Sequence, residues 1–132
     1  MNGERNHTAL LAYLASRQNT PFRWGENDCV LFAAGAIHAL TGRDPLAGIG
    51  AWENQRQALA QLKELGGLAA AVDGVLTAIP PALAQRGDIG MIESKRGPAL
   101  VVVCGLTLAG PGDQGIEHLP REALIRSWSA TA

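Results

Sequence analysis

The sequence has little charge, and neither sign dominates. Charged residues make up 17% of the 132 residues, and the formal net charge is -1. Proteins that bind nucleic acid present basic side chains to the phosphates, so this balance predicts no nucleic-acid partner. No stretch reaches the roughly 18 uninterrupted apolar residues that a membrane-spanning helix needs, so we expect no membrane span. The first residues also lack the pattern of a secretion signal, and export would need another carrier.

Patterns for metals, cofactors and disulfides are missing as well. The two cysteines, Cys29 and Cys104, and the three histidines stand far apart, without the paired spacing of a zinc site. No glycine-rich phosphate loop precedes a helix, so we expect no nucleotide and no other cofactor. A chain of this length can bury an adequate core without a covalent link, and we therefore expect two free thiols and one domain over residues 1–132.

Apolar periodicity divides the chain into a helical half and a strand-rich half. Helices are predicted from Asn6 or Thr8 to about Gln18, then over about 28–40, 51–65 and 68–77, with a glycine-rich linker at 46–50. Beyond Pro80-Pro81, short apolar runs predict strands at 88–93, 99–104, 106–109, 116–119 and 125–128. Residues 100–103 are typical of a strand buried on both faces. The chain is thus predicted to be an α+β domain, with N-terminal helices packed on a small, mostly antiparallel sheet.

Cys29 is the most informative residue, because it directly follows the strong helix-capping residue Asp28. A thiol in the first turn of a helix faces unpaired backbone N–H groups, which can lower its pKa. The sulfur should point toward the core, since Cys29 shares an apolar stripe with Phe32, Ala33, Ala36, Ile37 and Leu40. Trp24 would form the wall of a groove beside it, so Trp24 and Asp28 are candidate binding residues. A second interpretation makes Cys29 a buried structural residue.

A nucleophilic cysteine needs a base, and three histidines are candidates. His38 lies about half a turn away from Cys29 on the same helix and should face solvent. His7 falls in the opening turn of the first helix, where an exposed or capping role is expected. His118, in a predicted strand, could approach Cys29 from the sheet and is the candidate base, although alternation exposes half of an edge strand by default.

The order of these motifs resembles the NlpC-type cysteine peptidases, papain-like enzymes that cut peptidoglycan peptides. Trp24-Gly25 with Asp28-Cys29 is similar to that family's nucleophile motif, and Arg86-Gly87-Asp88-Ile89 is similar to its first core strand. Residues 100–105 resemble its second core strand. The chain resembles more closely a branch of the superfamily from tailed bacteriophages and prophages, whose members are taken to be tail components. Arg86-Gly87-Asp88 is better interpreted as a turn that opens a strand than as an adhesion motif.

One departure bears on activity. The resemblance places a histidine, the general base, at the start of the second core strand, and Ala99 stands there in this sequence. The residue that orients the histidine would be Asp113 or Gln114, which has no function without the base. The resemblance therefore implies a tail-tip or tail-assembly protein that keeps a peptidase-like fold and has lost its catalytic histidine.

Two alternatives stay open. The first is an active cell-wall endopeptidase or amidase that uses Cys29 as nucleophile and His118 as a relocated base. The second is a module that binds cell-wall peptide without cutting it. The partners implied are other tail proteins, peptidoglycan peptide and further copies of the chain in the tail, and the location implied is the virion tail after assembly in the bacterial cytoplasm.

Overall fold

The computed structural model describes residues 4–131. Residues 1–3, which belong to the stretch that was predicted to lack a secretion signal, lie outside the described residues. The elements in chain order are α1 (His7–Arg17), α2 (Cys29–Thr41), the 3-10 turn η1 (Pro45–Ile49), α3 (Gln55–Glu64), α4 (Leu68–Asp73), β1 (Thr77–Ile79), η2 (Pro81–Leu83), β2 (Ile89–Ser94), β3 (Gly97–Val103), β4 (Thr107–Gly112), β5 (Gly115–Pro120), η3 (Arg121–Ala123) and β6 (Arg126–Ser129).

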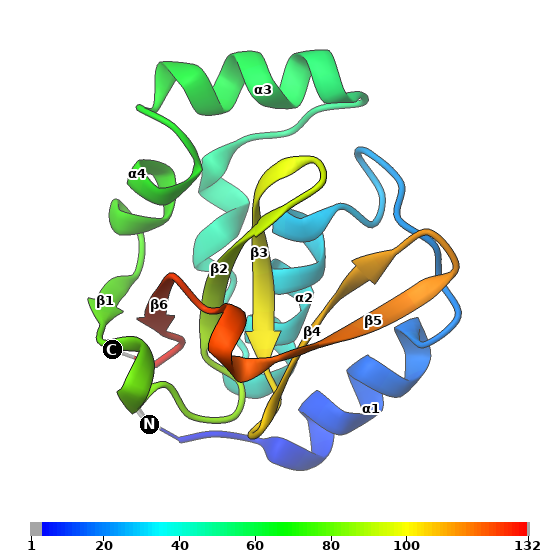
Figure 1. The fold of residues 1–132 in the computed structure, drawn as a ribbon, viewed down its shortest axis with the longest axis vertical. Helices are drawn as coiled ribbons and strands as arrows, with labels where there is room; N and C mark the ends of the chain where they lie inside the picture. Colours follow the sequence, from blue (N-terminus) through cyan, green and yellow to red (C-terminus); the bar gives the residue numbers. More distant parts are fainter. Residues whose placement is uncertain (1–3, 132) are drawn as a thin grey trace.

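The strands of residues 4–131 form one sheet in the order β1-β6-β2-β3-β4-β5, with every neighbouring pair antiparallel. Figure 1 shows the long helix α2 packed along one face of this sheet, and α3 crossing beyond the turn that joins β2 and β3. The predicted α+β class, with N-terminal helices on a mostly antiparallel sheet, is therefore confirmed.

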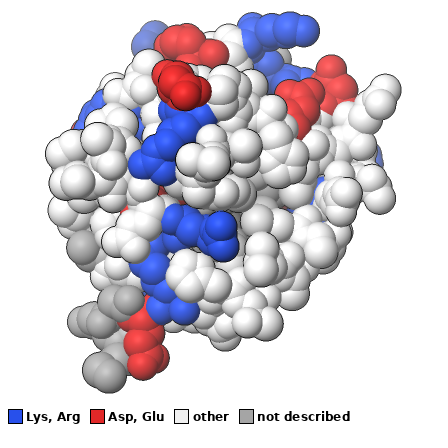
Figure 2. All heavy atoms as spheres, turned by 60° about the horizontal axis from the view of Figure 1, so that its bottom comes forward, with Lys and Arg blue, Asp and Glu red and all other residues white. Residues whose placement is uncertain are grey.

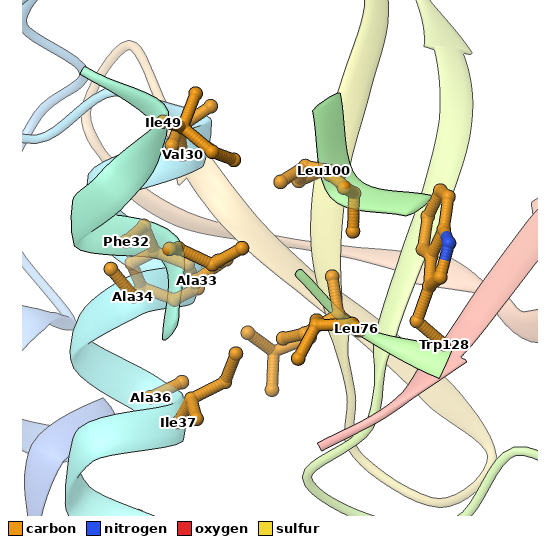
Figure 3. Packing of buried hydrophobic residues seen from close by; sticks show 14 of the residues in the cluster. Val30, Phe32, Ala33, Ala34, Ala36, Ile37, Ile49, Leu76, Leu100 and Trp128 are labelled. Atoms are coloured by element: carbon orange, nitrogen blue, oxygen red, sulfur yellow. The ribbon is translucent and has the colours of Figure 1, made fainter. Parts of the chain in front are cut away.

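The main core lies between α2 and the sheet. Figure 3 shows Phe32, Ala33 and Ile37 of α2 pointing toward Leu100 of β3 and Trp128 of β6. Each of these five side chains is buried. The stripe predicted for the second helix is thus the face that packs on the sheet, and His38 on the opposite side is exposed, as expected.

The other face of the sheet carries a second, smaller apolar cluster. Strand β3 supplies both clusters, because Leu100 and Val102 belong to the main core while Val101 and Val103 belong to the smaller one. All four residues are at most 2% exposed, so the strand buried on both faces is confirmed.

Two predicted helices have wrong bounds. The helix expected at 51–65 begins only at Gln55, since the Asn54 side chain caps it by accepting from the Gln57 N–H. The helix expected at 68–77 ends at Asp73. Thr77 instead begins strand β1, which pairs with β6 near the C-terminus, and this long-range pairing overrides the local helical pattern.

The interpretation of Arg86-Gly87-Asp88 as a turn that opens a strand is confirmed. Gly87 has φ +95°, and the triplet leads directly into β2. The Asp88 carboxylate is buried and accepts from Arg5 Nη2 at 2.7 Å and from the Ala130 N–H at 2.9 Å. It therefore ties both ends of the described chain to the sheet.

Candidate functional site

Cys29 is the first residue of α2, and it lies where two strands separate. β3 pairs with β4 only at Val102 and Val103, so the earlier part of β3 has no strand partner on that side. The N-terminus of α2 lies against this part of β3, where the Leu100 N–H is close enough to the Cys29 sulfur to lower the pKa of the thiol. The sulfur is thus held between a helix N-terminus and a strand edge.

Asp28 fixes the position of this helix end. One carboxylate oxygen accepts from the Leu31 N–H at 3.0 Å, which caps α2. The other accepts from the Gly25 N–H at 3.0 Å and from Trp52 Nε1 at 2.7 Å. Asp28, which was predicted as a binding residue, is fully buried, and both of its oxygens accept hydrogen bonds. Its role in the site is therefore structural.

The surroundings of Cys29 favour the neutral thiol. Burial raises the pKa of Cys29 to about 11, and the negative charge of Asp28 adds to the increase. The N–H groups of Leu100, Cys29 and Val30 act in the opposite direction and lower the pKa, but burial outweighs them. The prediction that the helix N-terminus would favour the thiolate is therefore wrong in its net direction.

A cavity of about 800 Å³ opens beside Cys29. Its walls come from the loop before α2, from α3 and its C-terminal turn, and from the ends of the β2–β3 and β4–β5 hairpins. Apolar residues of the wall include Phe22, Trp24, Trp52, Leu62 and Leu68. The placement of Trp24 beside Cys29 at a groove was predicted from the sequence, whereas the contributions of α3 and of the hairpins were not.

Charged side chains of both signs line the same cavity. They are Lys63, Lys95 and Arg96, together with Glu93, Asp113 and Glu117. On another face of the molecule, Figure 2 likewise shows basic and acidic side chains interspersed with wide uncharged areas. The sequence shows that these residues are charged, but only the folded chain shows that they share one cavity.

None of the three histidines lines this cavity. His7 and His38 lie at a separate hollow beside the C-terminal end of α2. His118 is exposed on β5, opposite Ala109 of β4. It is thus two strand spacings, roughly 10 Å, from β3. His118 is therefore not among the side chains that line the cavity with Cys29.

The β3 strand supplies no base either. The Ala99 side chain packs with the small cluster on the face of the sheet away from α2. Pro98 and Leu100, on either side of it in sequence, face the α2 side by strand alternation. Asp113, the candidate orienting residue, is instead paired with Arg96. Residues 98–100 therefore offer no titratable side chain to Cys29 on either face.

Cys29 and Cys104 are both free thiols. Within residues 4–131, no group of three or more histidine, cysteine or acidic side chains could hold a metal ion. No helix in that part of the chain is both long enough and apolar enough to cross a membrane.

Comparisons with known proteins give a family and a fold. A profile of the family described as "Domain of unknown function (DUF6950)" matches residues 3–130. No curated protein matches the chain. Among solved structures, the chain is similar to the crystal structure of the NlpC/p60 domain of peptidoglycan hydrolase SagA, with 21% identity, a TM-score of 0.60, and 94% of this chain and 98% of that chain covered. The chain therefore belongs to the DUF6950 family and has the fold of an NlpC/p60 domain.

Proposed function

We propose that this domain binds cell-wall peptide in the cavity beside Cys29 and does not cleave it. The observation that carries the proposal is a cavity of about 800 Å³ with apolar walls and charged groups, next to a neutral thiol and without a histidine. Its volume lies within the range of about 300–1,000 Å³ that is usual for ligand sites. The NlpC/p60 domain with the same fold belongs to a protein named as a peptidoglycan hydrolase, which suggests the class of ligand.

Cleavage of a peptide bond would need more than this site offers. The attacking species is the thiolate, and a second group must give a proton to the departing amine. Burial keeps the Cys29 thiol protonated at neutral pH, and the six titratable side chains that share its cavity are lysines, an arginine and carboxylates. Binding without turnover is the function that this geometry supports best.

The test uses the full chain and soluble muropeptides, with binding followed by calorimetry and products by mass spectrometry. We expect saturable binding and no new products. Trp24→Ala should weaken binding at least tenfold because it removes part of the wall, whereas His7→Ala, at the separate hollow, should leave the affinity unchanged. Absence of binding would refute the proposal.

A hydrolase with Cys29 as nucleophile is the second candidate. It is favoured by the backbone N–H groups of Leu100, Cys29 and Val30, which lower the pKa of the thiol, since such donors stabilise a thiolate. Muropeptide products that disappear in Cys29→Ala would establish this function and overturn the non-cleaving one.

The role in a phage tail stays a prediction from the sequence resemblance. The NlpC/p60 fold is common to the tail hypothesis and the cell-wall hypothesis, so the fold alone does not distinguish them. If the tail setting is right, the protein should co-purify with assembled tails, through contacts with other tail proteins or with its own copies. Its absence from purified tails would exclude that setting without affecting peptide binding.

A further inference from the structure

Arg96 connects three separate segments at the cavity. It lies in the turn between β2 and β3, and its guanidinium carbon stands 4.1 Å from the centre of the Phe22 ring. Its Nη2 donates to Asp113 Oδ1 at 2.7 Å, in the turn between β4 and β5. Arg96, Phe22 and Asp113 all line the cavity that holds Cys29. The guanidinium is thus placed where a bound molecule would meet it.

The ring of Phe22 is itself held in place. It packs edge-to-face against Trp24, with ring centres 5.0 Å apart. A cation over an aromatic face is attracted by the ring, so Phe22 restricts where the guanidinium can move. The stack orients the Arg96 group without using its N–H donors.

The pairing with Asp113 is easily exchanged. The Arg96 side chain is 42% exposed and that of Asp113 is 81% exposed, and an ion pair so exposed contributes little to stability. A guanidinium carries five N–H donors, and within residues 4–131 the Arg96 guanidinium makes only this one hydrogen bond. Most of its planar donor set therefore remains open to a carboxylate that could bind with both oxygens.

We propose that Arg96 binds a carboxylate of the peptide ligand, which replaces Asp113 as its partner. The inference rests on the proposed function and specifies the ligand class: a short peptide with an acidic side chain or a free carboxyl end. The other charges of the cavity balance, with Lys63 and Lys95 against Glu93 and Glu117. Discrimination then depends on the oriented guanidinium and not on a general positive field. Asp113 acts as a built-in competitor for it.

The experiment compares two forms of one muropeptide, with its carboxylates free or converted to carboxamides, by calorimetry at low and high salt. Wild type should bind the carboxylate form at least tenfold more tightly, and 0.5 M salt should reduce the difference because exposed charges are screened. Arg96→Gln should abolish the preference, because it should weaken binding of the carboxylate form far more than binding of the carboxamide form. Asp113→Asn should tighten binding of the carboxylate form severalfold, because the competing charge is gone.

The control is Arg56→Gln, a change at an exposed arginine of α3 outside the cavity, which should retain the wild-type preference. Equal affinity of wild type for the two forms would overturn this inference and leave the proposed function standing. An equal loss of affinity for both forms in Arg96→Gln would also overturn it, because it would indicate a structural role. Failure of wild type to bind either form would refute the proposed function and this inference with it.

Discussion

The indole N–H of Trp52 donates a 2.7 Å hydrogen bond to the buried carboxylate of Asp28. Trp52 comes from the segment before α3, and Asp28 caps α2, so one bond connects the cavity wall to the helix that carries Cys29. Asp28 thus serves three donors at once: a helix end, the Gly25 turn and this indole.

Asp28→Ala should destabilise the fold strongly. It removes the helix cap and leaves buried donors of Gly25 and Trp52 without a partner, a combined cost of about 2–4 kcal/mol. Urea titration of the wild type and the variant measures this loss as a difference in the free energy of unfolding. The matched control is Asn54→Ala, an exposed cap of α3, for which we expect about 1 kcal/mol. Equal losses in the two variants would contradict the importance assigned to the Trp52–Asp28 contact.

The ion pair between Arg5 and Asp88 should matter far more than the surface pairs. Both side chains are nearly inaccessible, with exposures of 9% and 1%. Asp88→Ala should cost about 3–5 kcal/mol, because it leaves the Arg5 charge buried and unpaired. Glu26→Ala, which breaks the exposed pair with Arg23, should cost less than about 1 kcal/mol. Thermal unfolding of both variants compares the two losses of stability. A small loss in Asp88→Ala would contradict the buried ion pair between Arg5 and Asp88.

Asp73 should make the stability of the fold depend on pH in the acidic range. Hydrogen bonds from Arg126 and from the Trp128 indole lower the pKa of this carboxyl below its ordinary value. Since the unfolded chain binds the proton more readily, Asp73 stabilises the fold at pH values above its unfolded pKa of about 3.9, and this contribution is lost as pH falls through the lower folded value. Asp73→Asn should therefore lower the unfolding temperature at pH 7 and reduce its fall between pH 5 and pH 2. An unchanged fall over that range would exclude this role for Asp73.

The features that the sequence predicts well are local. The Asp28 cap, the buried face of α2 and the apolar β3 strand each follow from residues within a few positions of one another, and the structure has all three. Strand β1 was missed because its partner β6 lies about fifty residues later. The hydrogen bonds from Trp52 to Asp28 and from Arg96 to Asp113 also join distant segments, and no short sequence motif predicts them.

The pKa of Cys29 also shows that a local sequence pattern misses the effect of distant segments. Its place after a capping residue predicts that backbone N–H groups lower the pKa of the thiol, and those of Cys29 and Val30 act in this direction. Burial depends on what α2 packs against, which is β3 with Leu100, and this contribution is the larger one. The local pattern therefore predicted the contribution of the backbone N–H groups but gave the wrong net direction for the pKa of Cys29.

The most direct test of the account is the pH dependence of Cys29 alkylation by iodoacetamide, measured in the Cys104→Ser background so that one thiol reacts. With a pKa of about 11, the rate should keep rising about tenfold per pH unit from pH 7 to pH 10, and His118→Ala should not change it. The contradicting result would be a rate that levels off at a pH below the ordinary thiol pKa of about 8.5, with the plateau lost in His118→Ala. That result would favour the hypothesis of an active peptidase with Cys29 as nucleophile.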